Sequence, residues 1–126
     1  MDYKPEGYNS VSPYIMVKNG QKFTDMLKHI FDATEKRKYL REDGSIMHAE
    51  IQIIDTVIMF SEATEAYPSV PMWLHVYVPH VHETFKKAIE FGCEKLDEPT
   101  QKGGDPDCRG NFKDADGINW SVSTQM

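Results

Sequence analysis

The chain of 126 residues has only two cysteines, Cys93 and Cys108. Their separation matches neither a disulfide framework nor a zinc motif. Isolated thiols are typical of cytosolic proteins, because disulfides persist mainly in oxidising compartments. A reactive Cys108 beside Arg109 is disfavoured, because the sequence shows no histidine or helix start close to it. We therefore expect two reduced thiols in a cytoplasmic protein.

Long apolar runs and an excess of positive charge are also missing. The longest apolar runs are far shorter than the roughly 20 residues that a helix needs to span a bilayer, and residues 1–6 lack the apolar segment of a signal peptide. Fourteen lysines and arginines stand against 20 aspartates and glutamates, which gives a formal net charge of −6. With no basic stripe to follow phosphates, we expect neither nucleic acid nor a membrane as a partner.

What the sequence does contain is a repeat, because the second half has the layout of the first. An extended run at 13–17 leads through Asn19 into a segment with apolar residues at helical spacing, namely Phe23, Leu27, Ile30 and Phe31. A second extended run at 73–78 leads into a segment with the same spacing, namely Val81, Phe85, Ala88 and Ile89. Short strand-like runs follow each helix. The repeat predicts an α+β fold of two β-α-β-β-β modules with mixed sheets in one domain.

The predicted modules span about residues 11–62 and 73–124, and a linker at 63–71 joins them. In the first module we expect a strand at 11–17, a helix from the Asn19 cap to about residue 33, and a hairpin of strands 45–53 and 56–62. In the second module we expect a strand at 73–78, a helix at 81–91 that ends at Gly92, a short strand at 93–97, a loop at 98–107, and a hairpin of strands 109–113 and 118–124.

Alternation of apolar and polar residues assigns the faces of three strands. In strand 45–53 we expect Met47, Ala49, Ile51 and Ile53 under the helix, and Ile46, His48, Glu50 and Gln52 on the other face. In strand 73–78, Trp73, His75 and Tyr77 lie opposite the aliphatic residues. In strand 118–124, Asn119, Ser121 and Ser123 lie opposite Ile118, Trp120 and Val122, which makes Trp120 a core residue. Because pairing two open sheets creates a cavity, we expect the polar and aromatic faces to line it.

Three segments occur in order at the repeat spacing: residues 43–50 (DGSIMHAE), 74–78 (LHVYV) and 107–120 (DCRGNFKDADGINW). The last is similar to a G-D-R-x-G-x-x-x-D-P-x-G-x-x-W ending, with Ala115 for the proline and Cys108 where arginine is usual. Together the segments resemble the glyoxalase/bleomycin-resistance/extradiol-dioxygenase superfamily, also called vicinal oxygen chelate proteins, and more narrowly its PhnB-like branch. The resemblance covers about residues 11–124 and implies that fold and a homodimer.

The resemblance also implies where a metal would lie. Metal-dependent members carry histidine and glutamate ligands on the first and last strands of each module. The matching positions are Ser12, Met59, Trp73 and Ser121, and a shift of two residues gives Tyr14, Ser61, His75 and Ser123. Of these only His75 is an ordinary ligand, and an open catalytic site needs at least three. We therefore expect no metal in the usual position and no cofactor.

Two chemical interpretations of the cavity residues remain open beside plain lining of a wet cavity. The first is a relocated metal triad of His48, Glu50 and His75, which matches the two-histidine, one-carboxylate arrangement of iron enzymes. The second makes Glu50 a general base, its pKa raised by partial burial, with His48 or His75 as its partner.

Ligand contacts are expected from Trp73, Tyr77 and Met59, which can stack on a planar molecule or fill the space of a metal, with Gln52 and Ser121 as polar neighbours. The leading hypothesis is a metal-independent protein whose cavity binds a small organic molecule, by sequestration or for lyase or isomerase chemistry. The alternative is a metal-dependent lyase, dioxygenase or glyoxalase-like enzyme that uses the relocated triad.

Overall fold

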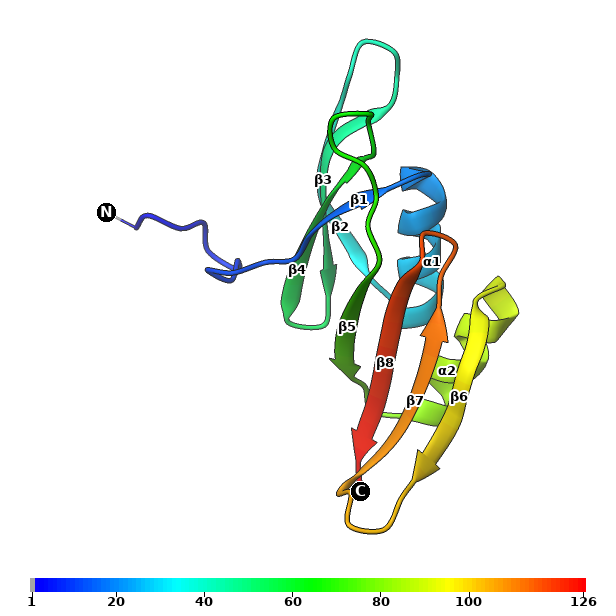
Figure 1. The fold of residues 1–126 in the computed structure, drawn as a ribbon. Helices are drawn as coiled ribbons and strands as arrows, with labels where there is room; N and C mark the ends of the chain where they lie inside the picture. The colour runs from blue at the N-terminus through cyan, green and yellow to red at the C-terminus, as the bar shows by residue number, and fades with distance from the viewer. Residues whose placement is uncertain (1) are drawn as a thin grey trace. The chain divides into compact units, whose positions relative to one another are not determined.

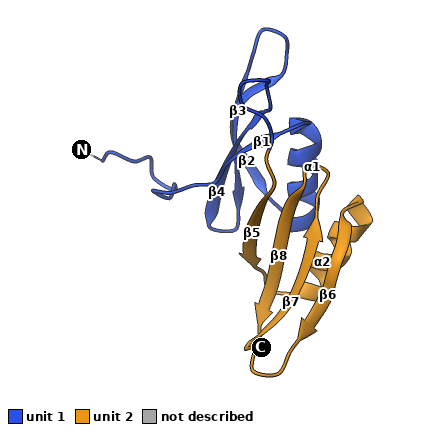
Figure 2. Cartoon of the chain, in the orientation of Figure 1, with its two compact units in different colours: residues 1–69 blue, residues 70–126 orange. Residues whose placement is uncertain are grey.

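The computed structural model describes residues 2–126, and the chain divides into two compact units, residues 1–69 and 70–126 (Figures 1 and 2). Each unit contains one helix and one four-stranded sheet. Within the described residues, neither helix has the length and apolar character that crossing a membrane requires.

Unit 1 consists of β1 (Tyr14–Val17), α1 (Gly20–Phe31), β2 (Thr34–Leu40), β3 (Ile46–Ile53) and β4 (Thr56–Glu62). Its strands are ordered β1-β4-β3-β2, with β1 parallel to β4 and the other neighbours antiparallel. Helix α1 packs on β3 and β4 and covers one face of the sheet (Figure 1). The opposite face of the unit 1 sheet, which α1 does not cover, is called its open face below.

Unit 2 repeats this arrangement with β5 (Met72–Tyr77), α2 (Val81–Phe91), β6 (Glu94–Gln101), β7 (Asp107–Lys113) and β8 (Ile118–Gln125). The strand order β5-β8-β7-β6 matches the order β1-β4-β3-β2 of unit 1, strand for strand. The parallel pair is again formed by the first and last strands of the unit, β5 and β8. The predicted α+β fold with two β-α-β-β-β modules is confirmed. The face away from α2 is the open face of unit 2.

Both helices begin and end as their sequences predict. The Asn19 side chain accepts a hydrogen bond from the Lys22 backbone N–H at 3.0 Å, which satisfies one of the unpaired amides of the first turn. Helix α1 ends at Asp32, and α2 ends at Gly92, where a left-handed φ of 110° suits a residue without a side chain. The apolar residues of each helix, such as Leu27 and Ala88, are buried against the sheet.

The sequence did not reveal β2, which is an edge strand with every residue exposed. Its residues TEKRKYL show no apolar alternation, because neither face of this edge is buried in the unit. Three consecutive cations, Lys36 to Lys38, lie along the strand. Charge on an edge strand prevents pairing with strands of other molecules, which accounts for a sequence that does not look like a strand.

The predicted loop at 98–107 is correct for residues 102–106 and wrong for the rest, because β6 continues to Gln101 and β7 begins at Asp107. Pro99 made a strand look improbable. The pairing of β6 with β7 is irregular between Asp97 and Thr100, so Pro99 falls in a bulge of an edge strand, where no backbone N–H is needed. Opposite it, a side chain on Gly110 would press on the Pro99 backbone nitrogen at 3.1 Å.

The first half of β3 also differs from the prediction. Met47, expected beneath the helix, is 50% exposed, whereas Ile46, expected on the open face, is 4% exposed. A side chain on Gly20, the first residue of α1, would collide with Ile46. The register explains the change: Tyr39 pairs with His48 but Leu40 pairs with Ile46, so β3 carries one extra residue at this point. Such a bulge reverses the alternation, and from His48 onward the predicted faces are correct.

Strand β1 is shorter than predicted, because it begins at Tyr14 and not at residue 11. The preceding residues still follow β4: the Pro13 carbonyl accepts the Met59 N–H at 2.9 Å, and the Asn9 side chain accepts the Val57 N–H at 3.1 Å. We call residues 2–12 the N-terminal arm. Its hydrogen bonds to β4 place the arm along the edge of the unit 1 sheet.

The faces of unit 2 agree with the prediction. Trp120 and Val122 are fully buried, and Trp120 stacks with Phe112 at a ring separation of 6.4 Å. Trp73 and Tyr77 are 60% and 58% exposed on the other face. Trp120 is therefore a core residue, as the alternation indicated.

One buried carboxylate closes the β7–β8 turn. Asp114 accepts hydrogen bonds from the Trp120 indole at 2.9 Å and from the backbone N–H groups of Asp116 and Ile118 at 2.9 and 3.0 Å. Burial raises the pKa of Asp114 above its ordinary value, although these three donors act in the opposite direction. The side chain thus ties the turn to the core of unit 2.

Replacing Asp114 with alanine should lower the free energy of unfolding by about 2–3 kcal/mol, because buried donors lose their acceptor. Chemical denaturation of the intact protein measures this loss. Asp55→Ala is the matched control: Asp55 lies in the exposed β3–β4 turn and accepts only from the Thr56 hydroxyl. The control should change stability by no more than about 0.5 kcal/mol. Equal losses in the two variants would contradict the role given to Asp114.

Candidate functional site

Glu50 is at the centre of the open face of unit 1, where it is only 5% exposed. It pairs across β3 and β4 with Met59, which in turn pairs with Tyr14 of β1. Burial of a carboxylate on a face that no helix covers requires hydrogen-bond donors close by. The neighbours of Glu50 supply them.

Each oxygen of Glu50 has its own partner. The Tyr8 hydroxyl donates to Oε1 at 2.6 Å, and His48 Nε2 lies 2.9 Å from Oε2. The Arg37 guanidinium is 3.8 Å from Oε1. Tyr8 belongs to the N-terminal arm, and cations of Lys36 and Arg37 lie over its ring at 5.1 and 5.4 Å from the centroid. The arm therefore contributes directly to the surroundings of Glu50, which the sequence did not indicate.

The hydrogen bonds continue from His48 across the sheet. His48 Nδ1 lies 3.4 Å from the Tyr14 hydroxyl, which is 2.9 Å from the Ser61 hydroxyl. Ser61 donates to the Met47 carbonyl at 2.8 Å. We call Tyr8, Glu50, His48, Tyr14 and Ser61 the polar chain of unit 1. It joins the arm, β3, β1 and β4 on one surface.

The prediction that the pKa of Glu50 lies above its ordinary value is wrong. Burial is the largest single influence and does act upward. The hydrogen bonds from Tyr8 and His48, together with the charges of His48 and Arg37, outweigh it, so the pKa lies below its ordinary value of 4.5. Glu50 is therefore an ionised hydrogen-bond acceptor at neutral pH. A general base needs a pKa closer to the working pH.

A pocket of about 340 Å³ adjoins the polar chain and lies wholly within unit 1. Its walls combine aromatic and thioether groups with a few polar ones: Tyr14, Met16, Arg41, Met47, Ser61, Glu62 and Tyr67. Most of this wall could not be predicted from the sequence. Met47 is expected on the opposite face of its strand, Tyr67 falls in the predicted linker at 63–71, and Arg41 lies outside the predicted elements. Alternation from Tyr14 to Met16 along β1 was the signal that could have found Met16.

The main polar groups of the pocket rim are fixed by the fold itself. Arg41 donates to the Ser45 hydroxyl at 3.0 Å and to the Glu62 carbonyl at 3.1 Å. Glu62 accepts from the backbone N–H groups of Ile46 and Gly20 at 2.6 and 3.0 Å. Their charges are thus held in place, and the aromatic and methionine side chains present the apolar surface.

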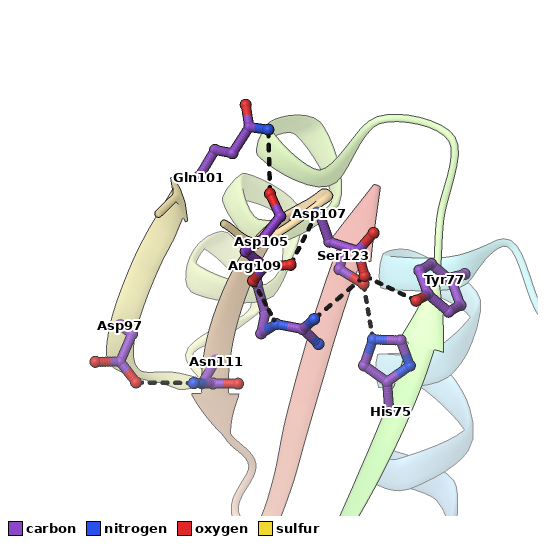
Figure 3. Close-up of polar contacts among 9 residues, drawn as sticks. All are labelled: His75, Tyr77, Asp97, Gln101, Asp105, Asp107, Arg109, Asn111 and Ser123. Atoms are coloured by element: carbon purple, nitrogen blue, oxygen red, sulfur yellow. Dashed lines mark hydrogen bonds and ion pairs between the residues drawn. The ribbon is translucent and has the colours of Figure 1, made fainter. Parts of the chain in front are cut away.

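The open face of unit 2 carries its own group of polar residues (Figure 3). His75 Nε2 lies 2.7 Å from the Ser123 hydroxyl, and the Tyr77 hydroxyl donates to Asp107 Oδ2 at 2.7 Å. Arg109 Nη2 donates to the same oxygen at 3.2 Å. Burial and the charge of Arg109 lower the pKa of His75, against a smaller opposite effect of Asp107. His75 is therefore a neutral imidazole at pH 7.

One hydrogen bond occupies the same place in both units. Met16 pairs with Ser61, and Tyr77 pairs with Ser123. Two residues earlier on the first strand, Tyr14 and His75 each reach the serine at 2.9 and 2.7 Å. These four residues are the positions that the two-residue shift selected in the sequence. The structure makes them two equivalent hydrogen-bonded pairs.

The carboxylate is not repeated. Glu50 pairs with Met59, and at the equivalent place in unit 2 Asn111 pairs with Ser121. Asn111 donates to Asp97 Oδ2 at 2.8 Å. A second pocket of about 390 Å³ lies here, and its lining is entirely polar or charged: Asp97, Glu98, Thr100, Lys102, Asp105, Arg109 and Asn111. The two open faces thus differ in chemistry although their backbones match.

The remaining predicted residues take these places. Met59 and Gln52 lie on the open face of unit 1, and Gln52 accepts from Lys36 Nζ at 3.1 Å. Ser121 lies on the open face of unit 2 beside His75, and Trp73 is exposed on the same face. Among the proposed catalytic residues, the structure brings His48 and Glu50 into contact. His75 belongs to the other unit.

The implied metal positions contain no cluster of ligands within a unit. Ser12 precedes β1, Met59 and Trp73 carry no ordinary ligand atom, and Ser121 pairs with His75. Inside either unit of the described chain, no three side chains of the His, Cys, Asp and Glu types are placed to hold one ion. The donor sets of the two units, taken separately, do not fit a resident divalent metal.

NMR titration of the Glu50 carboxyl carbon should give a pKa below 4.5, and Tyr8→Phe should raise it by removing a hydrogen bond to the ionised form. Because the folded pKa is the lower one, ionised Glu50 stabilises the fold above about pH 4.5, and this contribution is lost as pH falls through the folded value. Tyr3→Phe, elsewhere in the arm, is the control. If the Glu50 carboxyl titrates identically in Tyr8→Phe and in the wild type, the proposed contact of the arm with Glu50 is contradicted.

Comparison with solved structures finds similar folds at low sequence identity. TioX from Micromonospora sp. ML1 matches with a TM-score of 0.73 at 16% identity, covering 94% of this chain and 97% of its own. FosX, a fosfomycin resistance protein from Listeria monocytogenes solved with Mn(II) and sulfate, matches with a TM-score of 0.73 at 18% identity, covering 94% and 90%. The PhnB protein from Bacillus cereus gives 0.72 at 13%, covering 92% and 99%.

No protein-family model matches the chain, and no curated protein matches its sequence. The structural similarity extends over nearly the whole chain and includes both repeats. It shows that this protein has the glyoxalase/bleomycin-resistance fold that is found in FosX and the PhnB protein.

Proposed function

We propose that the protein binds a small organic molecule in the pocket of unit 1. The observation that carries the proposal is the contact between this pocket and the polar chain: Tyr14 and Ser61 belong to both. Small-molecule sites of about 300–1,000 Å³ are mostly apolar, with a few fixed polar groups that orient the ligand. A volume of about 340 Å³ with methionine and tyrosine walls fits that description.

The pocket of unit 2 fits such a ligand less well. Five of its seven lining residues carry charge, and Asp105 and Arg109 already form an ion pair at 3.5 Å. A neutral organic molecule entering it would displace water from charged groups and gain little apolar contact. The exposed indole of Trp73 and the ring of Tyr77 on the same open face are the proposed contacts of unit 2 with a planar molecule.

The state of Glu50 favours binding over proton abstraction. Its oxygens are engaged by Tyr8 and His48, and its pKa lies below the ordinary value. A carboxylate held in this way orients a donor on a ligand through charge-assisted hydrogen bonds, but it is a weak base. We therefore favour the sequestering version of the function over the lyase or isomerase version. Glu50 and His48 are the proposed polar contacts of unit 1, and His75 is the proposed polar contact on the open face of unit 2.

The fold neighbours support the class of function and a finer grouping. FosX is a fosfomycin resistance protein, and the Bacillus cereus neighbour is a PhnB protein. We propose a PhnB-like, metal-independent member of the vicinal oxygen chelate superfamily, located in the cytoplasm. The Mn(II) in FosX favours a second candidate, the metal-dependent enzyme with His48, Glu50 and His75 as ligands.

We also propose a homodimer. Each sheet has one face without a helix, and large apolar side chains such as Tyr39, Trp73 and Tyr77 are about half exposed there or at the sheet edge. Contact with a second copy would remove such surface from water. Light scattering on a sizing column should give twice the chain mass of 14.5 kDa. A single-chain mass at tens of micromolar would oppose the proposal.

Binding should be visible at the methionine methyl groups. When ¹³C-methyl methionine protein is screened against neutral aromatic fragments, hits should shift the signals of Met16 and Met47, which line the pocket. Met26, a buried residue of α1, is the internal control. Tyr67→Ala should weaken a hit roughly tenfold, because about 50 Å² of apolar contact is lost. Hits that leave Met16 and Met47 unchanged would place binding elsewhere.

Glu50→Gln separates a binder from an enzyme. The amide keeps the size and one acceptor oxygen, so a binder should retain most of its affinity for the same fragment. An enzyme that uses the carboxylate as a base should lose turnover by a factor of about 10² or more. Titration of both proteins with one hit, followed by product analysis, provides the comparison. Loss of turnover of that size would restore the lyase or isomerase version.

Metal content tests the second candidate. Protein purified without chelators should carry well under one equivalent of Zn, Ni, Mn or Fe by elemental analysis, because among the described residues neither unit groups three His, Cys, Asp or Glu side chains around one point. His29→Ala, on the surface of α1, serves as the control for adventitious binding. One full equivalent that disappears in His48→Ala or His75→Ala, but persists in the control, would establish the relocated triad.

A further inference from the structure

A cysteine and a histidine meet on the helix side of the unit 2 sheet, on the face opposite the open face of that unit. Cys108 Sγ of β7 lies 3.7 Å from His82 Nε2 in the first turn of α2. Asp107, the preceding residue, turns to the open face and accepts from Tyr77. Cys108 is 5% exposed, whereas His82 is exposed. The imidazole thus connects a buried thiol with solvent.

The same thiol is next to a helix start. Cys108 pairs with Thr124 of β8, and the Thr124 hydroxyl accepts the first N–H of α2, from Val81, at 2.9 Å. The N-cap residue His80 makes no side-chain hydrogen bond to the first turn. The remaining amides of that turn therefore retain the partial positive charge of a helix N-terminus, which stabilises a nearby anion.

Both reasons that disfavoured a reactive Cys108 in the sequence are wrong. The histidine is 26 residues away along the chain and the helix begins 27 residues away, so neither is apparent without the fold. An imidazole that accepts the thiol proton and a positive helix end that stabilises the thiolate are the two features that activate cysteines. A buried thiol that packs only among apolar groups is inert.

We propose that Cys108 and His82 form a thiol site that reacts with hydrogen peroxide. The reagent has to be small and uncharged because so little of Cys108 is exposed. The thiol proton moves to His82 Nε2, and the thiolate sulfur attacks one peroxide oxygen. An S–O bond forms as the O–O bond breaks, and the leaving hydroxide takes the proton from His82 as water. Sulfur is oxidised by two electrons to the sulfenic acid, and peroxide is reduced.

The sulfenic acid on Cys108 is not converted to a disulfide by the other cysteine of the same chain. The other cysteine, Cys93, follows the far end of α2, and eleven helical residues span about 16 Å. An intrachain disulfide needs Cα atoms within about 7 Å, so Cys93 is not a resolving thiol for Cys108. The sulfenic acid therefore persists until the chain is unfolded, when a reagent specific for sulfenic acids can trap it.

The experiment uses the full chain carrying Cys93→Ser. The folded protein is treated with hydrogen peroxide, the remaining peroxide is removed, and the chain is then unfolded in denaturant that contains dimedone, so that the trap reaches a sulfenic acid that the fold buries. Mass spectrometry of the Cys108 peptide measures the adduct. We expect a dimedone adduct on Cys108, and a rate of adduct formation about tenfold or more lower in His82→Gln, which keeps a hydrogen-bonding side chain but not the base. His80→Gln is the matched control, because His80 is exposed in the same turn and should leave the rate unchanged.

Two outcomes would overturn the proposal. The first is no adduct on Cys108 at peroxide concentrations that oxidise a free thiol peptide. The second is an equal or faster rate in His82→Gln, which would make the imidazole a cover and not a proton acceptor. Circular dichroism checks that the variants keep the fold, and His82→Asn supplies a second variant of the same exposed position. The thiol site and the pocket of unit 1 share no residue. A negative result for peroxide oxidation therefore does not contradict the proposed ligand binding, and a negative result for ligand binding does not contradict the thiol site.

Discussion

A four-stranded sheet with a single helix can bury only one of its faces, and this constraint organises the protein. The apolar residues lie between helix and sheet, such as Leu27 of α1 in unit 1 and Trp120 of β8 in unit 2. The other faces have to be stable in contact with water, so polar side chains on them satisfy one another across strands. Glu50 is the extreme case, since it is buried where no helix supplies a cover and depends on Tyr8 and His48 for its charge.

The same constraint determines how far the sequence could be interpreted. The helices could be predicted because each has one apolar face and a recognisable cap, Asn19 at the start of α1 and Gly92 at the end of α2. The central strand β8 could be predicted because its residues alternate between the buried and the open face. The edge strands β2 and β6 bury almost nothing and carry charge or proline, so their residues look like loops. An alternation argument also cannot detect an extra residue, and the bulge before His48 exchanged the places of Ile46 and Met47.

The residues of the candidate site that lie along one strand could be predicted from the sequence. The residues that reach the site from distant parts of the chain could not. His48, Glu50 and Gln52 share a face because they alternate along β3. Tyr8 reaches Glu50 from 42 residues away, and its hydroxyl, together with His48 and Arg37, places the Glu50 pKa below its ordinary value and not above it. Tyr67 and Arg41 join the pocket through connections between strands. No local pattern marks such residues, because their role depends on where the chain returns.

The two equivalent serines, Ser61 and Ser123, show how the repeated modules differ in chemistry. In one half the serine is bonded to a phenol and in the other to an imidazole, yet the strands around them keep the same register. A phenol stays neutral across the physiological range, whereas an imidazole is the side chain whose ordinary titration falls within it. The two halves therefore present different titration chemistry at an equivalent site while their strands keep the same register. A repeated module can thus hold side chains of different reactivity on one backbone arrangement.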